Sequence, residues 1–384
     1  MFSSSFGPSA RPLRMAVLTR YEELGASSRV RALQYLPYLK QEGIEATVFP
    51  LFSNRYLERM YEGKRPFREA MAAYVRRCLQ LRSVEGFDLI WLEKEVFPML
   101  PYVIDRVLLK KTPVVLDIDD AVFHNYDLSP RRWVRALLGD KIDRLMANSA
   151  LVTAGNGYLA DRAKRAGAPW VEVLPSPVPL ARYTGPARCG IATRTADRFR
   201  IAWIGSPATA LYLEPLKGAF QQLSRSHDIE FRVIGAASPN WEGVNCVSIP
   251  WSETTEVELL KECDLGIMPL RDSPWEKGKC SFKLIQYMAC GLPVIASPIG
   301  MNRDVVDQGR TGLFATTEFE WLAALQFMIE HPAEAAQMGA LGRSEIEARF
   351  NTESQARQLA RWLRIAAGGQ PTESAAISGP PTRG

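Results

Sequence analysis

The 384-residue sequence contains few of the side chains that usually bind metals or form cross-links. It has three histidines and six cysteines, and no two cysteines form a Cys-x-x-Cys pair. These counts predict neither a zinc module nor a disulfide framework, and they fit a reducing compartment. The sequence also has no run of about 18 apolar residues, and residues 1–14 lack the apolar stretch of a signal peptide. We therefore expect a cytoplasmic protein, either free or bound peripherally to the inner face of the cell membrane.

The sequence also has little excess of one sign of charge. Lys and Arg number 47 and Asp and Glu number 42, which leaves a formal net charge of +5. So small an excess, with no recognisable binding module, predicts no nucleic-acid partner. Hydrophobic residues make up 47% and charged residues 23% of the chain, so at this length we expect two packed cores.

Short apolar runs alternate along the chain with segments of helical period, which is typical of parallel βαβ units. One series fills residues 15–178 and a second fills residues 199–348, with an aperiodic linker at 179–198. The pattern predicts an α/β protein of two Rossmann-like domains facing each other across a cleft, where the carboxyl ends of both sheets bind ligands. Residues 349–368 are expected to form a helix that packs back on the first domain. The two ends of the chain are expected to be disordered, at residues 1–14 and 369–384.

The segment from Lys277 to Ser297 carries most of the chemical information. It predicts a helix from Phe282 to about Cys290, with Ser281 as its N-cap, followed by a strand. Unpaired N–H groups at a helix start favour anions, so this start and the nearby lysines predict a seat for a diphosphate. The residues expected to contribute are Lys279, Cys280, Ser281, Phe282 and Lys283, with Gln286 one turn deeper for a ribose hydroxyl. The alternative is an ordinary amphipathic helix with two solvated lysines.

The run from Lys279 to Gly300, KCSFKLIQYMACGLPVIASPIG, resembles the donor-nucleotide motif of family-4 glycosyltransferases. DLGIMPL before it and GRTGLFA after it are similar to the same family, as are Ile201–Ser206 and Gly25–Arg31. The resemblance implies the two-domain GT-B fold and the retaining transfer of a sugar from a nucleoside diphosphate sugar, with no obligatory metal or other cofactor. It also implies that the donor lies on the second domain, whose opening turn holds Gly205 and Ser206, and that the acceptor lies on the first.

Two positions depart from that family. Its pair of glutamates, eight residues apart, falls on Gly278 and Gln286, so neither carboxylate is present. The amide of Gln286 keeps an acceptor oxygen but loses the charge, which weakens such a bond by roughly half. The arginine and lysine that many members place after the first donor-domain strand are also absent. We therefore predict that Lys283 stabilises the departing diphosphate.

Acidic residues follow the predicted strand Pro113–Asp117 of the first domain at its carboxyl end, where a cleft forms. We expect Asp119, Asp120 and His124 to act there together with Lys283 as catalytic residues. The resemblance implies a histidine in this loop that touches the donor sugar, and its place falls on Asp119. Three alternatives remain, namely a Mg²⁺ or Mn²⁺ site formed by the carboxylates, which we do not favour, a helix cap, and a surface loop. For His124 the alternative is a structural role.

The acceptor side of the cleft is expected to include residues that follow the first and third predicted strands. Ser27 or Ser28 would cap the next helix, and Arg29 or Arg31 would clamp a phosphate bidentately. The alternative is a capped helix with exposed arginines. The carboxylates of Glu93 and Glu95, after the third strand, are expected to bind acceptor hydroxyls.

Residues 54–82 contain eight Lys or Arg and three Glu, interleaved with aromatic and aliphatic residues. This basic amphipathic pattern predicts contact with an anionic membrane surface or a lipid-linked acceptor. The alternative is a solvated helical surface around an apolar packing stripe.

These patterns together predict a glycosyltransferase of hexosyltransferase type, acting in polysaccharide biosynthesis. It would move a sugar from a nucleoside diphosphate sugar to a glycan or lipid-linked saccharide. Two alternatives are an inactive nucleotide-sugar-binding protein that has lost both glutamates, and a nucleotide-sugar epimerase. A dinucleotide oxidoreductase is disfavoured because no Gly-x-Gly-x-x-Gly follows either opening strand.

Overall fold

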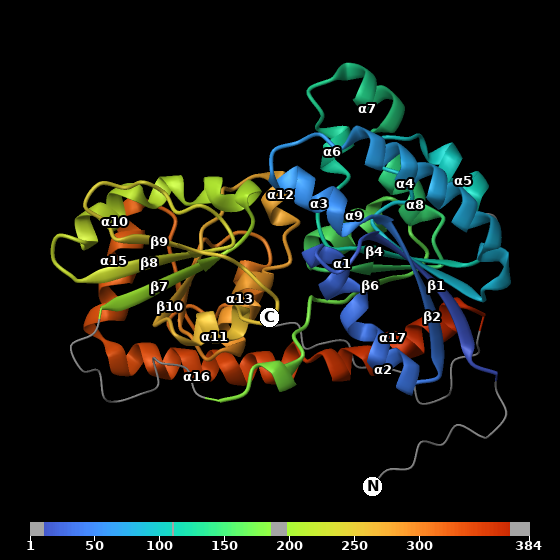
Figure 1. Cartoon of the computed structure of the whole chain (residues 1–384). Helices are drawn as coiled ribbons and strands as arrows, with labels where there is room; N and C mark the ends of the chain where they lie inside the picture. Colours follow the sequence, from blue (N-terminus) through green and yellow to red (C-terminus); the bar gives the residue numbers. More distant parts are fainter. Residues whose placement is uncertain (1–10, 110, 186–197, 369–384) are drawn as a thin grey trace, which may run out of the picture.

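A computed structural model describes residues 11–109, 111–185 and 198–368. The chain forms two α/β lobes side by side, with two consecutive C-terminal helices running beneath them (Figure 1). The expectations for residues 1–10, for residues 186–197 of the linker and for residues 369–384 fall outside the described part. Within the described residues, no helix is both long and apolar enough to cross a bilayer.

The first lobe is built on a six-stranded parallel sheet with strand order β2-β1-β3-β4-β5-β6. Strands β3 and β4 are buried along their whole length, which explains why their sequences are continuous apolar runs. Strand β1 begins at Leu13, so the expectation that residues 1–14 are disordered is wrong for residues 13 and 14. The strands are β1 (Leu13–Tyr21), β2 (Ile44–Phe52), β3 (Leu89–Glu93), β4 (Val114–Ile118), β5 (Leu151–Ala154) and β6 (Val171–Val173).

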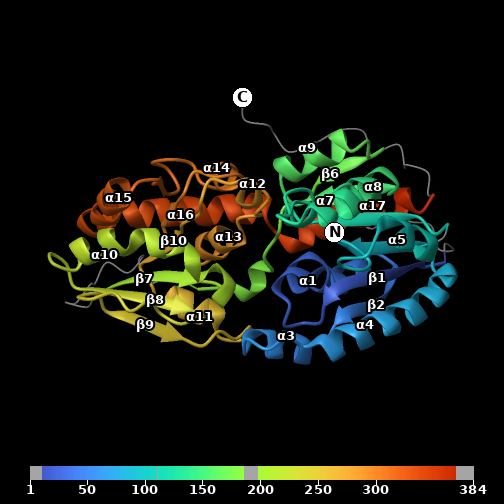
Figure 2. The same cartoon turned by 90° about the horizontal axis from the view of Figure 1, so that it is seen from above.

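Helices cover both faces of this sheet. One face is covered by the 3-10 turn η2 and by helices α5, α8 and α9, and the other by α1, η1, α2 and the C-terminal helix α17 (Figure 2). The helical elements of the lobe are α1 (Ala26–Arg31), η1 (Leu33–Tyr35), α2 (Leu36–Gln41), α3 (Asn54–Tyr61), α4 (Phe67–Gln80), η2 (Leu81–Gly86), α5 (Tyr102–Leu109), α6 (His124–Asp127), α7 (Arg132–Leu138), α8 (Lys141–Ala147), α9 (Gly157–Arg165) and η3 (Leu180–Arg182).

The second lobe repeats this architecture with strand order β12-β11-β10-β7-β8-β9, and all pairs are parallel. The strands are β7 (Phe199–Ile204), β8 (Ile229–Ile234), β9 (Cys246–Ile249), β10 (Leu265–Met268), β11 (Val294–Ala296) and β12 (Leu313–Phe314). The helical elements of this lobe are η5 (Pro207–Tyr212), η6 (Glu214–Leu216), α10 (Lys217–Leu223), α11 (Glu256–Lys261), α12 (Pro274–Lys277), α13 (Phe282–Ala289), α14 (Asn302–Val305), α15 (Glu318–Glu330) and α16 (Pro332–Arg349). The last helix, α17 (Thr352–Ala366), packs on the first lobe. The predicted fold class of two Rossmann-like units is confirmed.

The C-terminal helix ties the two lobes together. The chain leaves the second lobe through α16, pairs Asn351 with Val178 in an isolated bridge, and then enters α17. The Tyr35 hydroxyl donates to Gln355 Oε1 at 2.9 Å, and Leu359 and Leu363 are fully buried against the first sheet's core. Part of the first lobe's core is therefore supplied by the end of the chain.

Leu359→Ala tests how much this helix contributes. Removing a buried leucine side chain leaves a cavity, so we expect the free energy of unfolding to fall by about 2 to 5 kcal/mol in denaturant titrations. Arg361→Ala, on the exposed side of the same helix, is the matched control and should change it by less than about 0.5 kcal/mol. Equal effects of the two substitutions would contradict the assignment.

Candidate functional site

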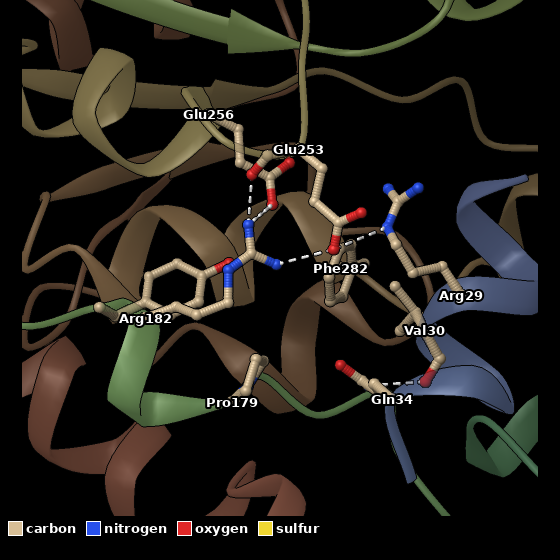
Figure 3. A pocket seen from close by; sticks show the side chains of 9 residues that line it. Arg29, Val30, Gln34, Pro179, Arg182, Glu253, Glu256 and Phe282 are labelled. Atoms are coloured by element: carbon tan, nitrogen blue, oxygen red, sulfur yellow. Dashed lines mark hydrogen bonds and ion pairs between the residues drawn. The ribbon is translucent and has the colours of Figure 1, made fainter. Parts of the chain in front are cut away.

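A pocket of about 180 Å³ lies between the two lobes (Figure 3). Helix α1 contributes Arg29 and Val30 from the first lobe, and Phe282 contributes from the start of α13 in the second. The other residues that line it are Gln34, Pro179, Arg182, Tyr183, Glu253 and Glu256. An interlobe pocket is the arrangement that the sequence predicted for the ligand site.

One side of this pocket is a chain of alternating charges that crosses between the lobes. Arg182 lies 3.2 Å from carboxylate oxygens of both Glu253 and Glu256, and Arg29 Nε lies 3.9 Å from Glu253 Oε1 (Figure 3). The Arg29 guanidinium also lies over the ring of Trp251, 4.8 Å from its centroid. Arg29 therefore faces the interlobe region, whereas its acidic and aromatic partners belong to the second lobe.

The start of α13 presents a cation that no carboxylate neutralises. Lys283 Nζ lies over the Trp203 ring, 4.2 Å from its centroid, and donates to Thr209 Oγ1 at 3.4 Å. It forms no ion pair within the described residues. Burial, aided by the charge of Lys279, lowers the pKa of Lys283 to about 7. An anion bound beside Lys283 would supply the missing countercharge.

The glycine turn after β7 lies against this lysine. A Cβ atom placed on Gly205 would lie 2.6 Å from Lys283 Nζ and 2.6 Å from the Trp203 ring. Ser206 precedes the short helix η5, and its carbonyl oxygen accepts from Thr209. Lys279 lies nearby on the Tyr212 side, with Nζ 5.9 Å from that ring's centroid. The structure thus brings Gly205, Lys279 and Lys283 to one place.

Two details of α13 differ from the sequence prediction. Ser281 occupies the N-cap position, but its φ is +51° and its hydroxyl donates to Asn302 Oδ1 at 2.7 Å instead of capping the helix. The first backbone hydrogen bond of α13 runs from the Ile285 N–H to the Ser281 carbonyl. The N–H groups before Ile285 therefore have no acceptor within the helix. Gln286 is buried beside Tyr183, so it is not presented to a ribose in this arrangement.

The two lobes touch most closely around Gly278, one of the two positions where the resemblance implies a glutamate. A Cβ atom on Gly278 would lie 2.5 Å from Ala121 Cβ of the first lobe. The Cys280 thiol donates to the Asp119 carbonyl at 2.9 Å, and burial raises its pKa well above the ordinary value. Asn156 Nδ2 donates to the carbonyls of Lys277 and Lys279. Space for a side chain at position 278 is therefore taken by the facing lobe.

The acidic loop after β4 lies at this contact, but its charge is largely neutralised. Lys94, which has a φ of +62°, places its ammonium 3.1 Å from Asp119 Oδ1 and 3.5 Å from Asp120 Oδ2. Burial disfavours the charged form of Asp119, yet Lys94 and a hydrogen bond from Ser27 outweigh it and lower the pKa. Burial and the charge of Asp119 raise the pKa of Asp120. Asp120 is the partly exposed member, with 30% of its side chain accessible.

Several predicted cleft residues have structural partners instead. Arg31 is buried and makes a bidentate pair with Asp117 at 2.6 and 2.9 Å, so it is not a phosphate clamp. Both ring nitrogens of His124 are engaged, by Asp127 and by the Tyr158 hydroxyl at 2.8 Å each, which favours the structural alternative.

The predicted acceptor carboxylates are also corrected. Glu93 is buried and accepts from the hydroxyls of Ser27 and Ser28, so neither serine caps α1, whose N-cap is Gly25. Glu95 points into the core, where it pairs with Lys141 at 2.8 Å and Arg20 at 2.9 Å. An acceptor hydroxyl therefore meets neither carboxylate in this arrangement.

Sequence reasoning missed three residues of the interlobe region, and each could have been found from sheet register. Lys94 follows β3, which pairs with β4 so that Glu93 lies opposite Asp117, and this places Lys94 beside Asp119. Trp203 and Trp251 lie at or just beyond the carboxyl ends of β7 and β9, where ligands are expected. Among the described residues, no cluster of three or more His, Cys, Asp or Glu has the arrangement of a metal site.

Comparisons with known proteins agree with this architecture. Residues 198–331 match the family model described as Glycosyl transferases group 1. Sucrose-phosphate synthase from Thermosynechococcus elongatus superposes with a TM-score of 0.69 at 15% identity, covering 92% of this chain and 98% of that one. Anabaena HepE in complex with UDP gives 0.65 at 16% identity, covering 92% and 100%. An E. coli trehalose-6-phosphate protein bound with UDP-2-fluoro glucose gives 0.62 at 13% identity, covering 94% and 100%.

These likenesses show that the chain has the GT-B fold. No curated protein matches the chain by sequence. The family match covers the second lobe, which is the lobe that carries Lys279 and Lys283. The sequence of the first lobe lies outside that match.

Gly278→Glu tests the close contact between the lobes. The added side chain meets the Ala121 backbone and Cβ, so we expect it to force the lobes apart and lower the free energy of unfolding by about 1 to 3 kcal/mol. Small-angle X-ray scattering should show a larger radius of gyration. Gly157→Glu adds the same charge where a Cβ meets nothing within 4 Å and should change neither quantity. An unchanged radius for Gly278→Glu would contradict the packing described here.

Proposed function

We propose that the protein transfers a sugar from a nucleoside diphosphate sugar to a hydroxyl group of a glycan or lipid-linked saccharide, with retention of the anomeric configuration. The observation that carries the proposal is Lys283, a largely buried cation without a carboxylate partner among the described residues. It lies at the start of α13, whose first residue, Phe282, lines the interlobe pocket. Phosphate is the ligand class that such a position favours.

The proposed step depends on positioning and electrostatics. The bond between the anomeric carbon and the diphosphate oxygen breaks, and negative charge develops on the departing diphosphate. Lys283, Lys279 and the N–H groups at the start of α13 stabilise this charge. The acceptor oxygen bonds to the same face of the sugar and gives its proton to the leaving phosphate, so no protein nucleophile is required.

The first lobe would hold the acceptor and part of the sugar. Asp120 is partly exposed at the cleft and interacts electrostatically with Lys279, so it is our candidate for contact with sugar hydroxyls. Asp119 and Lys94 would position it. Arg29 is the candidate cation from this lobe, since it faces the pocket. A lipid-linked acceptor would place the protein peripherally on the inner face of the cell membrane, with residues 54–82 toward anionic lipid.

UDP sugars are the donors to test first. The HepE and E. coli structures hold UDP, UDP-glucose or a UDP-sugar analogue. A thermal-shift comparison of UDP, GDP and ADP sugars would identify the base, because a ligand that binds only the folded state raises the unfolding temperature.

One observation favours a second candidate, a nucleotide-sugar-binding protein without transferase activity. Both family glutamates are absent, and the backbone at Gly278 is packed against the facing lobe. Such a protein would show nucleotide-sugar binding by thermal shift and neither transfer nor hydrolysis. Product analysis with and without acceptors therefore distinguishes the two candidates, and interconversion of donors without acceptor would identify an epimerase.

Lys283→Ala should lower turnover with a nucleotide sugar by roughly 10²-fold or more, the effect of losing one preorganised donor to the leaving group. Lys277→Ala is the matched control, because Lys277 pairs with Asp272 on the outer side of the same loop. The control should keep turnover within about twofold of the parent. Equal turnover of Lys283→Ala and the parent protein would remove Lys283 from the proposed role.

The pH dependence of nucleotide binding provides an independent check. Lys283 has a pKa of about 7 in the empty site, so it is charged below pH 7 and largely neutral above it. Because a diphosphate needs the charged form, the dissociation constant for UDP should rise about tenfold per pH unit above 7, with proton uptake visible by calorimetry. Lys283→Arg stays charged, so its profile should be flat over the same range. A flat profile for the parent protein would show that Lys283 does not meet the phosphate.

A further inference from the structure

The exposed apolar side chains of the molecule are concentrated on one part of the first lobe. Twelve of the sixteen large hydrophobic side chains that are exposed in the described residues lie between residues 60 and 137. The second lobe has only two such side chains among its described residues, Leu211 and Phe319. Exposed apolar groups gathered in this way mark a contact surface.

Helix α4 carries the largest share. Its exposed stripe repeats every four residues at Phe67, Met71, Val75 and Leu79, and Phe67 is 73% exposed. The opposite side of the helix is the one that packs, through Ala73 and Arg77. The apolar stripe of α4 therefore points to solvent, whereas Tyr56, Leu57 and Tyr74 of residues 54–82 pack inward. The packing alternative thus holds for part of the segment but not for the α4 stripe.

Helix α7 repeats the pattern outside residues 54–82. Val134 and Leu138 pack inward, while Trp133 and Leu137 lie four residues apart on the outer face and are 56% and 57% exposed. A tryptophan on an outer helix face is typical of the membrane interface, where its ring is amphipathic.

The two helices are linked through the loop that carries Met99. The Tyr74 hydroxyl of α4 donates to the Pro98 carbonyl at 2.6 Å, and the next residue, Met99, donates its N–H to the Tyr126 hydroxyl of α6 at 3.1 Å. Met99 is itself exposed, and α6 packs against α7. Figure 1 shows α4, α5 and α7 in the upper part of this lobe, and Figure 2, seen from above, shows α4 along one edge of it. We call this surface, from α4 through Met99 to α7, the docking face.

The docking face carries four arginines that no carboxylate of the described residues neutralises. Arg65 and Arg68 flank the α4 stripe, and Arg131 and Arg132 precede Trp133, and none of the four forms an ion pair within the described residues. Residues 128–138 contain three arginines and no acid. A water-exposed apolar stripe bordered by unpaired arginines is complementary to an anionic lipid surface, where headgroup phosphates meet the guanidinium groups.

We propose that the docking face lies on an anionic bilayer and that α7 is its second anchor, beside the interlobe cleft. The loop that touches the second lobe, at Asp119 and Ala121, leads directly into α6, which packs against α7. Docking through α7 would therefore place the cleft next to lipid headgroups. The placement of the cleft beside the headgroups matters only under the proposed function, in which a lipid-linked acceptor enters the cleft. The bilayer contact itself does not depend on the proposed function.

The test is co-sedimentation of the full chain with vesicles of phosphatidylcholine alone or mixed with phosphatidylglycerol at roughly 2:1. We expect binding to the mixed vesicles that weakens with added salt. Arg131→Gln with Arg132→Gln should lower the partition coefficient roughly 30-fold, and Phe67→Ser with Val75→Ser should lower it at least tenfold. Brominated lipid should quench tryptophan emission less in Trp133→Phe than in the parent protein.

Matched controls lie on the second lobe and the C-terminal helix. Phe319→Ser removes a side chain that is 78% exposed, and Arg357→Gln removes an exposed arginine, and neither should change vesicle binding. All variants should keep the parent's unfolding temperature and its thermal shift with UDP, because none touches the pocket. If the parent protein binds UDP but does not bind the mixed vesicles, the docking proposal alone is overturned. If it binds the mixed vesicles but no nucleotide sugar, the proposed function alone is overturned.

Three results would overturn the proposal. The first is equal binding to neutral and mixed vesicles, or binding that the α7 substitutions leave unchanged. The second is a dimer in sedimentation velocity that the α4 or α7 substitutions dissolve, which would assign the face to a second copy of this chain. The third is quenching by brominated lipid that Trp133→Phe does not reduce.

Discussion

The close approach of the two lobes at Gly278 and Gly155 is the constraint on which the site depends. At Gly155 a Cβ atom would lie 2.1 Å from the Cys280 sulfur, and at Gly278 it would meet Ala121. A single apolar cluster continues through this contact, since it includes Ala121 from one lobe and Cys280 and Leu284 from the other. Small residues at the contact let the loops meet, and the loops in turn hold the start of α13 at the edge of the pocket.

The distribution of compensated charge follows from that arrangement. In the first lobe two buried cations at the interlobe side have carboxylate partners, because Arg31 pairs with Asp117 and Lys94 with Asp119. Such pairs repay the desolvation that burial imposes on each ion. In the second lobe Lys283 has an aromatic ring and a hydroxyl instead of a carboxylate. Burial therefore lowers the pKa of Lys283, and a bound anion would favour its charged form again, which is the physical basis for treating it as a ligand site.

Local sequence patterns were sufficient to predict both sheets, because fully buried parallel strands are short apolar runs whose boundaries turn residues mark. They also identified the helix that starts at Phe282. The partners of individual polar residues were not predictable in the same way. Glu95 follows a strand and Arg31 ends the helix after one, yet their side chains turn inward to partners 46 and 86 residues away in sequence. Ser281 occupies a cap position, but Asn302 competes for its hydroxyl.

The same limit explains why residues 54–82 left two interpretations open. A repeat of apolar residues at helical spacing shows that a helix has an apolar side, but it does not show whether that side meets the core or the solvent. Burial decides the question: Ala73 and Arg77 of α4 face the lobe, and Phe67 and Val75 face outward. An inward-facing arginine is accommodated because Arg77 donates to the carbonyls of Thr19 and Phe49. The helix is thus anchored through a charged residue, and its apolar stripe is left exposed to water. Burial of that stripe against a bilayer or a partner protein would be favourable.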